Sequence, residues 1–230
     1  LKGPQGTLWG RNATGGAILL TMLEPSEAPT AKIKASYASY NHSTAQAYGS
    51  SALTDTIAAD ISGYWEESDG YVKNVVTGSD RDGALQRRGI RLSGVWNASD
   101  DINFKLAYDH HDWDDNTPVA TSALDGQSTG ALTGAVVSSK PKRVSNNGNP
   151  NFSAQIDGLY LTSRFNIGEM ELASYTMGRQ ETSKSVLDLD SSSQTLFHNF
   201  FNIENESFSQ EFNLSGAALD DKLDWIAGLY

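Results

Sequence analysis

Apolar and polar residues alternate along much of the chain after residue 30. In the clearest stretch, 102–109, isoleucine, phenylalanine, leucine and tyrosine occupy every second position and mostly polar residues lie between them. Successive side chains of a β-strand point to opposite faces, so this pattern predicts a strand with one apolar and one polar face. We expect the even-numbered positions of 90–96 and of 102–108 to share the apolar face.

The same alternation predicts about nine strands in all. They lie at 31–41, 44–52, 56–68, 86–97, 102–113, 154–167, 169–180, 206–215 and 222–230. Pro25 and Pro29 precede the first of them, and a proline can neither continue a helix nor donate to a β-ladder. The sequence therefore predicts an all-β, antiparallel domain at 30–230, after a separate segment at 1–29.

The connections between these strands differ in length in a regular way. From the third strand onward, short polar turns at 97–101, 166–169 and 216–221 alternate with long polar segments at 69–85, 114–153 and 181–205. Long loops at one end and tight turns at the other are typical of an outer-membrane β-barrel. Since single-chain bacterial barrels have an even number of strands, about nine strands mean either that the count is off by one or that the barrel is cut short, as part of a larger transmembrane barrel would be.

Composition narrows the possible functions. The longest apolar run, 17–20, is far shorter than the roughly 20 residues of a membrane helix. A net charge of −11 argues against a nucleic-acid partner, and the lack of cysteine excludes a disulfide scaffold, a thiolate metal site and a cysteine nucleophile. No catalytic motif is present, so the sequence predicts neither an enzyme nor a bound cofactor.

The first 16 residues contain five glycines and one proline, which favours turns and close backbone approaches. The spacing from Gly10 to Gly15 suits a phosphate-binding loop, but Gly16 and Ala17 stand where such a loop needs lysine and serine or threonine. This near match therefore argues against a nucleotide site. The residues that define the motif are Gly3, Pro4, Gly6, Gly10, Arg11, Gly15 and Gly16.

This opening closely resembles the end of the plug domain in TonB-dependent outer-membrane receptors. Later stretches resemble the same family in order, namely 36–41, 69–74, 208–214 and 223–230. The resemblance implies that 1–29 is the C-terminal end of the plug with its linker and that 30–230 is the N-terminal part of the transmembrane barrel. Since neither end of the sequence coincides with a natural boundary of this family, we expect the chain to be a fragment.

The resemblance also implies a function. A receptor of this family lies in the bacterial outer membrane, contacts its lipid, and takes up a scarce solute such as a ferric siderophore, cobalamin or a glycan. A TonB-type periplasm-spanning protein supplies the energy, and its binding segment is expected upstream of residue 1. Two alternatives remain open: a passive porin or adhesin-type barrel, and a soluble carbohydrate-binding β-sandwich.

Three groups of side chains are candidates for specific roles. His110, His111 and Asp112 are possible metal ligands at a strand end, although consecutive strand residues point to opposite faces and cannot converge on one ion. Lys2 or Arg11 of the plug could form an ion pair with Glu211 of the barrel wall. Aromatic residues near strand ends are candidates for interfacial girdles: Tyr37, Tyr40, Tyr64, Trp65, Trp96, Trp113 and Trp225.

Overall fold

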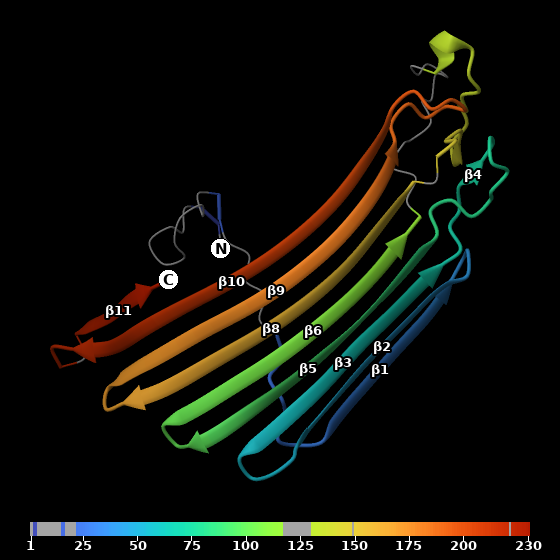
Figure 1. Ribbon diagram of the computed structural model, residues 1–230. Coiled ribbons are helices and arrows are strands. Elements are labelled where there is room, and N and C mark those ends of the chain that lie inside the picture. The colour runs from blue at the N-terminus through green and yellow to red at the C-terminus, as the bar shows by residue number, and fades with distance from the viewer. Residues whose placement is uncertain (1, 4–14, 17–21, 117–129, 149, 221) are drawn as a thin grey trace.

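Nine strands form one antiparallel sheet whose spatial order follows the chain (Figure 1). The computed structural model describes residues 2–3, 15–16, 22–116, 130–148, 150–220 and 222–230. The strands of the sheet are β1 (Thr30–Ala38), β2 (His42–Ala52), β3 (Ile57–Ser68), β5 (Leu85–Ser99), β6 (Ile102–Asp115), β8 (Asn151–Ile167), β9 (Met170–Asp188), β10 (His198–Ala218) and β11 (Leu223–Leu229). The prediction of about nine antiparallel strands in an all-β fold is confirmed.

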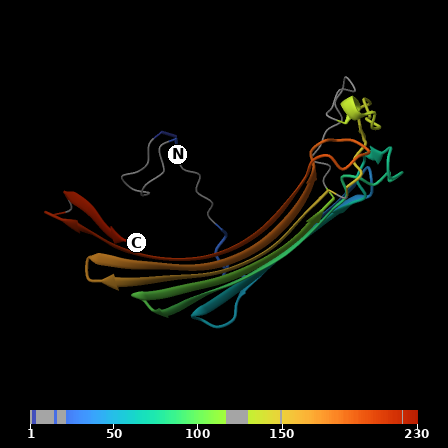
Figure 2. The ribbon, with the colours of Figure 1, turned by 45° about the horizontal axis from the view of Figure 1, so that its top comes forward.

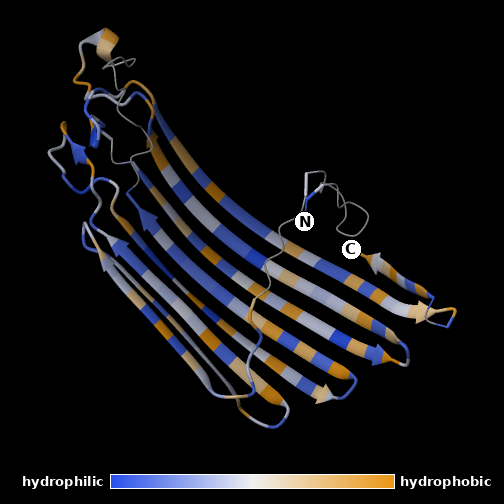
Figure 3. Ribbon diagram, turned by 180° about the vertical axis from the view of Figure 1, so that it is seen from behind, coloured by the Kyte–Doolittle hydropathy of each residue, from blue (hydrophilic) through white to orange (hydrophobic). Residues whose placement is uncertain are grey.

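The register of the sheet gathers apolar side chains on one face. Leu92 pairs with Tyr108, Trp96 with Phe104, and Leu106 with Leu161. Paired residues of an antiparallel ladder lie on the same face, so the even-numbered positions of 90–96 and 102–108 share a face as predicted. Figure 3 shows the resulting alternation of hydrophobic and hydrophilic positions along the strands.

This apolar face is the convex, exposed side of the sheet. Leu106 is 52% exposed and Phe208 is 74% exposed, whereas the buried apolar residues of the described chain are mostly alanines. A soluble sheet would cover such a face with a second layer. The hydrophobic surface is therefore directed outward, as in a barrel that contacts lipid.

The opposite face is concave and carries polar and charged residues. The sheet curves around the segment that leads into β1 (Figure 2). In this segment Glu24 Oε1 lies 3.1 Å from Lys105 Nζ, and Ser26 N donates to Ser50 Oγ at 2.7 Å. The backbone N–H of Ala52 also donates to the carbonyl oxygen of Glu27 at 3.2 Å. We call residues 22–29 the strap, because these contacts hold it against the concave face.

The connections at the two ends of the sheet differ in length, as the sequence predicts. Tight turns join β5 to β6, β8 to β9 and β10 to β11 at one end, and the long connections lie at the other (Figure 1). The predicted long loop 181–205 is too long, however, because β9 continues to Asp188 and β10 begins at His198. Backbone pairing extends this hairpin beyond the region in which the sequence alternates, for example between Lys184 and Asn202.

At the long-loop end, segments from separate connections pack together. A short parallel pair joins β4 (Lys73–Asn74) to β7 (Arg143–Val144), and the 3₁₀ turn η1 (Ala131–Thr133) lies nearby. Buried polar side chains connect these segments: Asn74 Nδ2 donates to Asp82 Oδ2 at 3.1 Å and to the carbonyl oxygen of Asn146 at 2.9 Å. The long connections are thus held to one another by polar contacts.

Among the described residues there is no helix with the length and apolar character needed to cross a membrane.

Candidate functional site

Aromatic and polar side chains cluster on the concave face where β3, β5 and β6 lie side by side. Tyr64 of β3 and His111 of β6 flank Gly89 of β5 in register. Trp113 Nε1 donates to the Tyr64 hydroxyl at 2.6 Å, and this hydroxyl lies 3.3 Å from His111 Nδ1. His111 Nε2 in turn lies 3.3 Å from Asp109 Oδ2. The indole, phenol, imidazole and carboxylate therefore form one continuous chain of polar contacts.

Gly89 makes this arrangement possible. A Cβ atom at this position would lie 2.5 Å from both His111 Nδ1 and Tyr64 Cε1, closer than real side chains allow. The two rings therefore lie over the β5 backbone, with their centroids 5.8 Å apart. A side chain at position 89 would displace one or both rings from the wall.

Charged groups on the same face are mostly paired. Arg91 Nη1 lies 3.4 Å from Asp60 Oδ1, and Ser93 Oγ donates to the same oxygen at 2.8 Å. Arg87 binds Asp115 with an Nη2–Oδ2 distance of 2.5 Å, and its guanidinium carbon lies 6.0 Å from the centre of the Trp113 ring. These cross-strand pairs fix the shape of the concave wall.

The strap adds an ion pair that sequence reasoning missed. Lys105 is largely buried, with 18% of its side chain exposed, whereas Glu24 is 63% exposed. The two residues are 81 positions apart, and nothing in the sequence brings them together. This contact between the N-terminal segment and the wall places an acid on the strap and a base on the wall, and it is distinct from the predicted pairing of Lys2 or Arg11 with Glu211.

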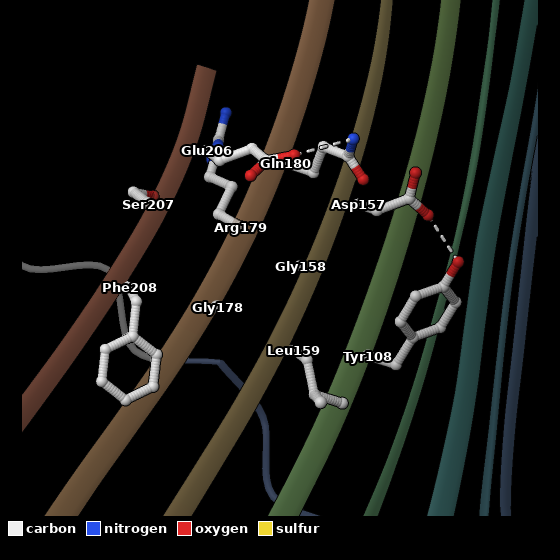
Figure 4. A pocket seen from close by; sticks show the side chains of 10 residues that line it. All are labelled: Tyr108, Asp157, Gly158, Leu159, Gly178, Arg179, Gln180, Glu206, Ser207 and Phe208. Atoms are coloured by element: carbon white, nitrogen blue, oxygen red, sulfur yellow. Dashed lines mark hydrogen bonds between the residues drawn. The ribbon is translucent and has the colours of Figure 1, made fainter. Parts of the chain in front are cut away.

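On the convex face, the border of the apolar surface is marked by a shallow hollow of about 450 Å³ (Figure 4). Gly178 leaves space between Leu159 and Phe208, which lie on the apolar side of the hollow. On the polar side, the Tyr108 hydroxyl donates to Asp157 Oδ1 at 2.6 Å. The outward surface therefore changes from apolar to polar at this level of the sheet.

The sequence-predicted metal candidates do not converge on one point. His110 Nδ1 lies 2.9 Å from Asp157 Oδ1, while Asp112 is bound by Arg88 with an Nη2–Oδ2 distance of 2.6 Å. Both lie on the convex face, whereas His111 contacts Asp109 on the concave face. The three side chains are thus divided between the two faces of the sheet.

The members of the proposed plug–wall pair are only partly described. Glu211 lies on the concave face in the same cross-strand row as Tyr175, Thr162 and Lys105. Its Oε1 accepts a hydrogen bond from Asn213 Nδ2 at 2.7 Å. Gly3, Gly15 and Gly16 of the glycine-rich motif are described, and Lys2 forms an isolated bridge with Gly16. Pro4, Gly6, Gly10 and Arg11 lie outside the described residues.

The predicted aromatic girdle also needs a correction. Trp96 pairs with Phe104 and Trp225 pairs with Gly216 on the convex face, as a girdle requires. Tyr64 and Trp113 instead belong to the concave cluster. Proximity to a strand end could not reveal this difference, because the face depends on the parity of the position within the strand.

One group of metal-ligand side chains was missed altogether. Asp188, Asp190 and His198 bring one potential ligand atom each to within 4.8 Å of one another at the long-loop end. The carboxylates are already engaged, however. Asp188 accepts from the backbone N–H groups of Asn147 and Ser191, at 3.1 Å each. Asp188 therefore holds two loop segments, at Asn147 and at Ser191, in place by hydrogen bonds to their backbone.

Asp190 has the same loop-organising role. Burial alone would raise the pKa of Asp190, but hydrogen bonds from Ser192, Phe197 and Leu196 outweigh burial and hold the pKa below its usual value. The ionised carboxylate accepts from the amides of Leu196 and Phe197 at 3.1 and 2.8 Å. Because its pKa is lowered on folding, Asp190 stabilises the loop above about pH 4, and this contribution is lost as the pH falls through the lowered value.

We therefore expect Asp190→Asn to loosen the loop 189–197. Loss of a charged acceptor for these part-buried amides costs about 1 to 3 kcal/mol, so hydrogen exchange at Leu196 and Phe197 should accelerate by roughly 5- to 160-fold at neutral pH. The difference between the variant and the unaltered protein should shrink as the pH falls through the lowered pKa of Asp190, because the carboxylate of the unaltered protein then loses its charge. Asp55→Asn, in a turn at the opposite end of the sheet, is the control. Unchanged exchange at both amides would contradict the assigned role.

Comparison with solved structures identifies the fold. The chain resembles the ferric yersiniabactin uptake receptor FyuA from Yersinia pestis over 99% of its own length and 34% of that chain, with a TM-score of 0.76 and 17% identity. It resembles the open form of the ferric-catecholate import receptor Fiu from Escherichia coli K12 over 95% of its length and 36% of that chain, with a TM-score of 0.75 and 16% identity. No protein-family model matches the chain.

A third similar structure extends the comparison to another bacterium. The siderophore receptor PiuA from Acinetobacter baumannii matches 94% of the chain and 31% of its own, with a TM-score of 0.73 and 14% identity. The chain therefore spans about a third of the length of each of these receptors. Its fold is that of a section of a receptor β-barrel, and the resemblance inferred from the sequence is confirmed at the level of the fold.

Proposed function

We propose that the chain is part of a TonB-dependent outer-membrane receptor that takes up a scarce solute. The observation that carries this proposal is the division of the sheet between an exposed apolar convex face and a polar concave face crossed by the strap. The convex face suits contact with outer-membrane lipid. The strap joins the glycine-rich segment, which on this proposal is the end of a plug, to the first strand of the barrel.

The fold comparisons support an uptake role, because all three similar proteins are named as uptake, import or siderophore receptors. On this proposal the solute arrives at the long-loop end, and a TonB-type periplasm-spanning protein supplies the energy for its release past the plug. The candidate solutes are a ferric siderophore, cobalamin or a glycan. The concave cluster of Tyr64, His111 and Trp113 belongs to the wall of the passage.

Collapse of the proton gradient tests the proposal. In cells that carry the intact protein, a protonophore is expected to abolish uptake of a labelled ferric-catecholate complex and to leave its binding to the cell surface unchanged, since only release requires plug movement. Cells without the protein provide the background for both measurements. Equal protein-dependent uptake with and without the gradient would instead support a passive porin.

The proposed receptor also needs contacts that hold the plug and can be released. The Glu24–Lys105 pair is one such contact at the strap. A second contact, between Glu211 and either Lys2 or Arg11, remains a prediction. It is consistent with the position of Glu211 on the concave face.

A further inference from the structure

The hollow on the convex face contains an open apolar slot. Register places Leu159, Gly178 and Phe208 side by side on β8, β9 and β10, with the glycine in the middle (Figure 4). Because neighbouring strands lie about 4.8 Å apart, the two apolar residues flank a gap of roughly 10 Å. A Cβ atom on Gly178 would meet none of the described residues beyond its chain neighbours within 4 Å. We call this gap the Gly178 slot.

A row of polar side chains lies directly beyond the slot, toward the long-loop end. Asp157, Gln180 and Glu206 are register partners on the same three strands. Gln180 Nε2 donates to Glu206 Oε1 at 3.5 Å, and Asp157 Oδ1 accepts from the Tyr108 hydroxyl at 2.6 Å. In the described part of the chain, no hydrogen bond or ion pair engages the second oxygen of either carboxylate. The row therefore presents free acceptors to the surface.

The negative charge of this row is not balanced by a neighbouring cation. Arg179 belongs to the concave face, because successive strand residues point to opposite sides, and it contacts Glu181 there at 3.3 Å. Along the described convex positions of β8, β9 and β10 the basic residue is Lys184, four residues beyond Gln180 and thus about 13 Å away. His110, 2.9 Å from Asp157, is charged only when protonated.

The row lies at the level where hydrocarbon gives way to headgroups. On β8 the convex positions are mostly apolar from Ile167, beside the tight turn, to Leu159. These eight residues, at about 3.3 Å each and a tilt of about 40°, span roughly 20 Å, close to the apolar band of about 25 Å around such barrels. Beyond them the convex positions Asp157, Gln155 and Ser153 are polar. On the proposed function, the carboxylates therefore face the headgroups of the outer leaflet.

The chemistry of the row favours a primary ammonium group. A phosphate would be repelled by the two carboxylates. A single metal ion cannot bind both, because Asp157 and Glu206 are two strands apart, roughly 10 Å, whereas Ca²⁺ binds oxygen at about 2.3 to 2.6 Å. An ammonium group has three donors and can bind one carboxylate together with Gln180 Oε1. Since the row continues into the apolar slot, an acyl chain attached to the same molecule would lie in the slot.

We propose that the Gly178 slot binds one outer-leaflet lipid whose headgroup ends in a primary ammonium group. The ammonium group binds a carboxylate beside Gln180, and an acyl chain lies over the glycine between Leu159 and Phe208. This lipid site is separate from the uptake pathway and rests on the proposed function only in placing the convex face in the outer membrane. The strands β8, β9 and β10 have sheet neighbours on both sides, so the site is complete within this chain.

Native mass spectrometry of the intact purified protein tests the proposal. The protein is titrated in detergent with phosphatidylethanolamine, the simplest lipid with this headgroup. Phosphatidylcholine keeps the positive charge without N–H donors, and phosphatidylglycerol lacks the positive charge. One phosphatidylethanolamine should bind more tightly than either, by roughly fivefold relative to phosphatidylglycerol, which is the upper range for an exposed ion pair.

Two variants separate the slot from the polar row. Gly178→Leu fills the slot without a clash and should weaken binding of phosphatidylethanolamine and phosphatidylglycerol alike, by roughly fivefold, because the acyl chain loses its packing contacts. The double variant Asp157→Asn/Glu206→Gln should instead remove the preference for phosphatidylethanolamine, because the headgroup no longer meets a negative charge.

The convex face supplies a matched control for each variant. Gly94 of β5 is the register partner of Leu106, and a Cβ atom there would lie 3.7 Å from the nearest atom, so Gly94→Leu adds the same side chain elsewhere on this face. Glu67, Gln86 and Asp114 form a second convex row of two carboxylates around a glutamine, with no glycine in the neighbouring row. Glu67→Gln/Asp114→Asn therefore removes the same charge where there is no slot. Both controls should retain the affinity and the headgroup preference.

The lipid site is refuted if the three lipids bind alike, or if the control variants lose as much binding as the slot variants. Dimers of the intact protein that disappear with Gly178→Leu, whichever lipid is present, would assign the slot to a second copy and also refute it. Lipid binding would stand even if uptake proved insensitive to the proton gradient. Conversely, gradient-dependent uptake without a headgroup preference would refute only the lipid site.

Discussion

Replacement of Leu106 by arginine is expected to destabilise the protein in a lipid bilayer by about 2 to 4 kcal/mol, the cost of an arginine near the middle of the lipid-facing surface of a barrel. Leu106 lies on the convex face of β6, is 52% exposed and pairs directly with Leu161 of β8. Its neighbours along this face of β6, Phe104 and Tyr108, are also apolar or aromatic. The guanidinium would therefore lie in hydrocarbon without a polar partner.

The same substitution on the concave face provides the control. Tyr175 is exposed, lies on the concave face of β9 and pairs with Glu211, so Tyr175→Arg places its charge in a polar environment opposite a carboxylate. Denaturant titration of the intact protein in bilayers should show a much smaller loss of stability for this variant. Equal destabilisation by the two substitutions would contradict the assignment of the convex face to lipid.

The alternation of residues was sufficient to predict most of the sheet. Leu106 and its neighbours in 102–108 show the reason: a strand between lipid and a polar lumen must alternate with a period of two, and few other structures produce this pattern. Where the two faces of a strand do not differ in polarity, the signal disappears. Residues 181–188 and 198–205 carry no alternation, yet backbone hydrogen bonds pair them throughout, as between Thr182 and Glu204. In this part of β9 and β10, the length of the strands is set by backbone pairing and leaves no periodic pattern in the sequence.

The concave cluster and the strap contact could not be predicted in the same way. Alternation assigns a residue to a face, but the register determines its neighbours, and register depends on every turn between two strands. Tyr64 and His111 are 47 residues apart and meet over Gly89 only because β3, β5 and β6 are aligned at that point. The Glu24–Lys105 contact depends further on the path of the strap, for which the sequence carries no periodic signal.

The second large loss of stability is expected when the ion pair between Arg91 and Asp60 is broken. The side chain of Asp60 is fully buried and that of Arg91 is 17% exposed. Asp60 Oδ1 is bound by Arg91 and Ser93, whereas Oδ2 has no hydrogen-bond partner among the described residues. Removal of the guanidinium would therefore leave a buried carboxylate with a single neutral donor.

We expect Arg91→Ala to lower the free energy of unfolding by about 3 to 5 kcal/mol, the cost of leaving one member of a buried ion pair uncompensated. Arg91→Lys should cost less, because it keeps the positive charge within reach of Asp60, although it loses the planar fork of donors. Both values can be measured by denaturant titration of the intact protein in the same bilayers as the Leu106 variants.

The double variant Arg91→Ala/Asp60→Asn separates the buried charge from lost packing. If the carboxylate is the source of the destabilisation, its replacement by a neutral amide in the Arg91→Ala background should recover a large part of the lost stability, so the two substitutions should be strongly non-additive. The opposite result, in which the two losses simply add, would mean that water reaches Asp60 when Arg91 is removed. The concave wall at β3 and β5 would then be held by its backbone ladder and by packing, without a substantial contribution from this ion pair.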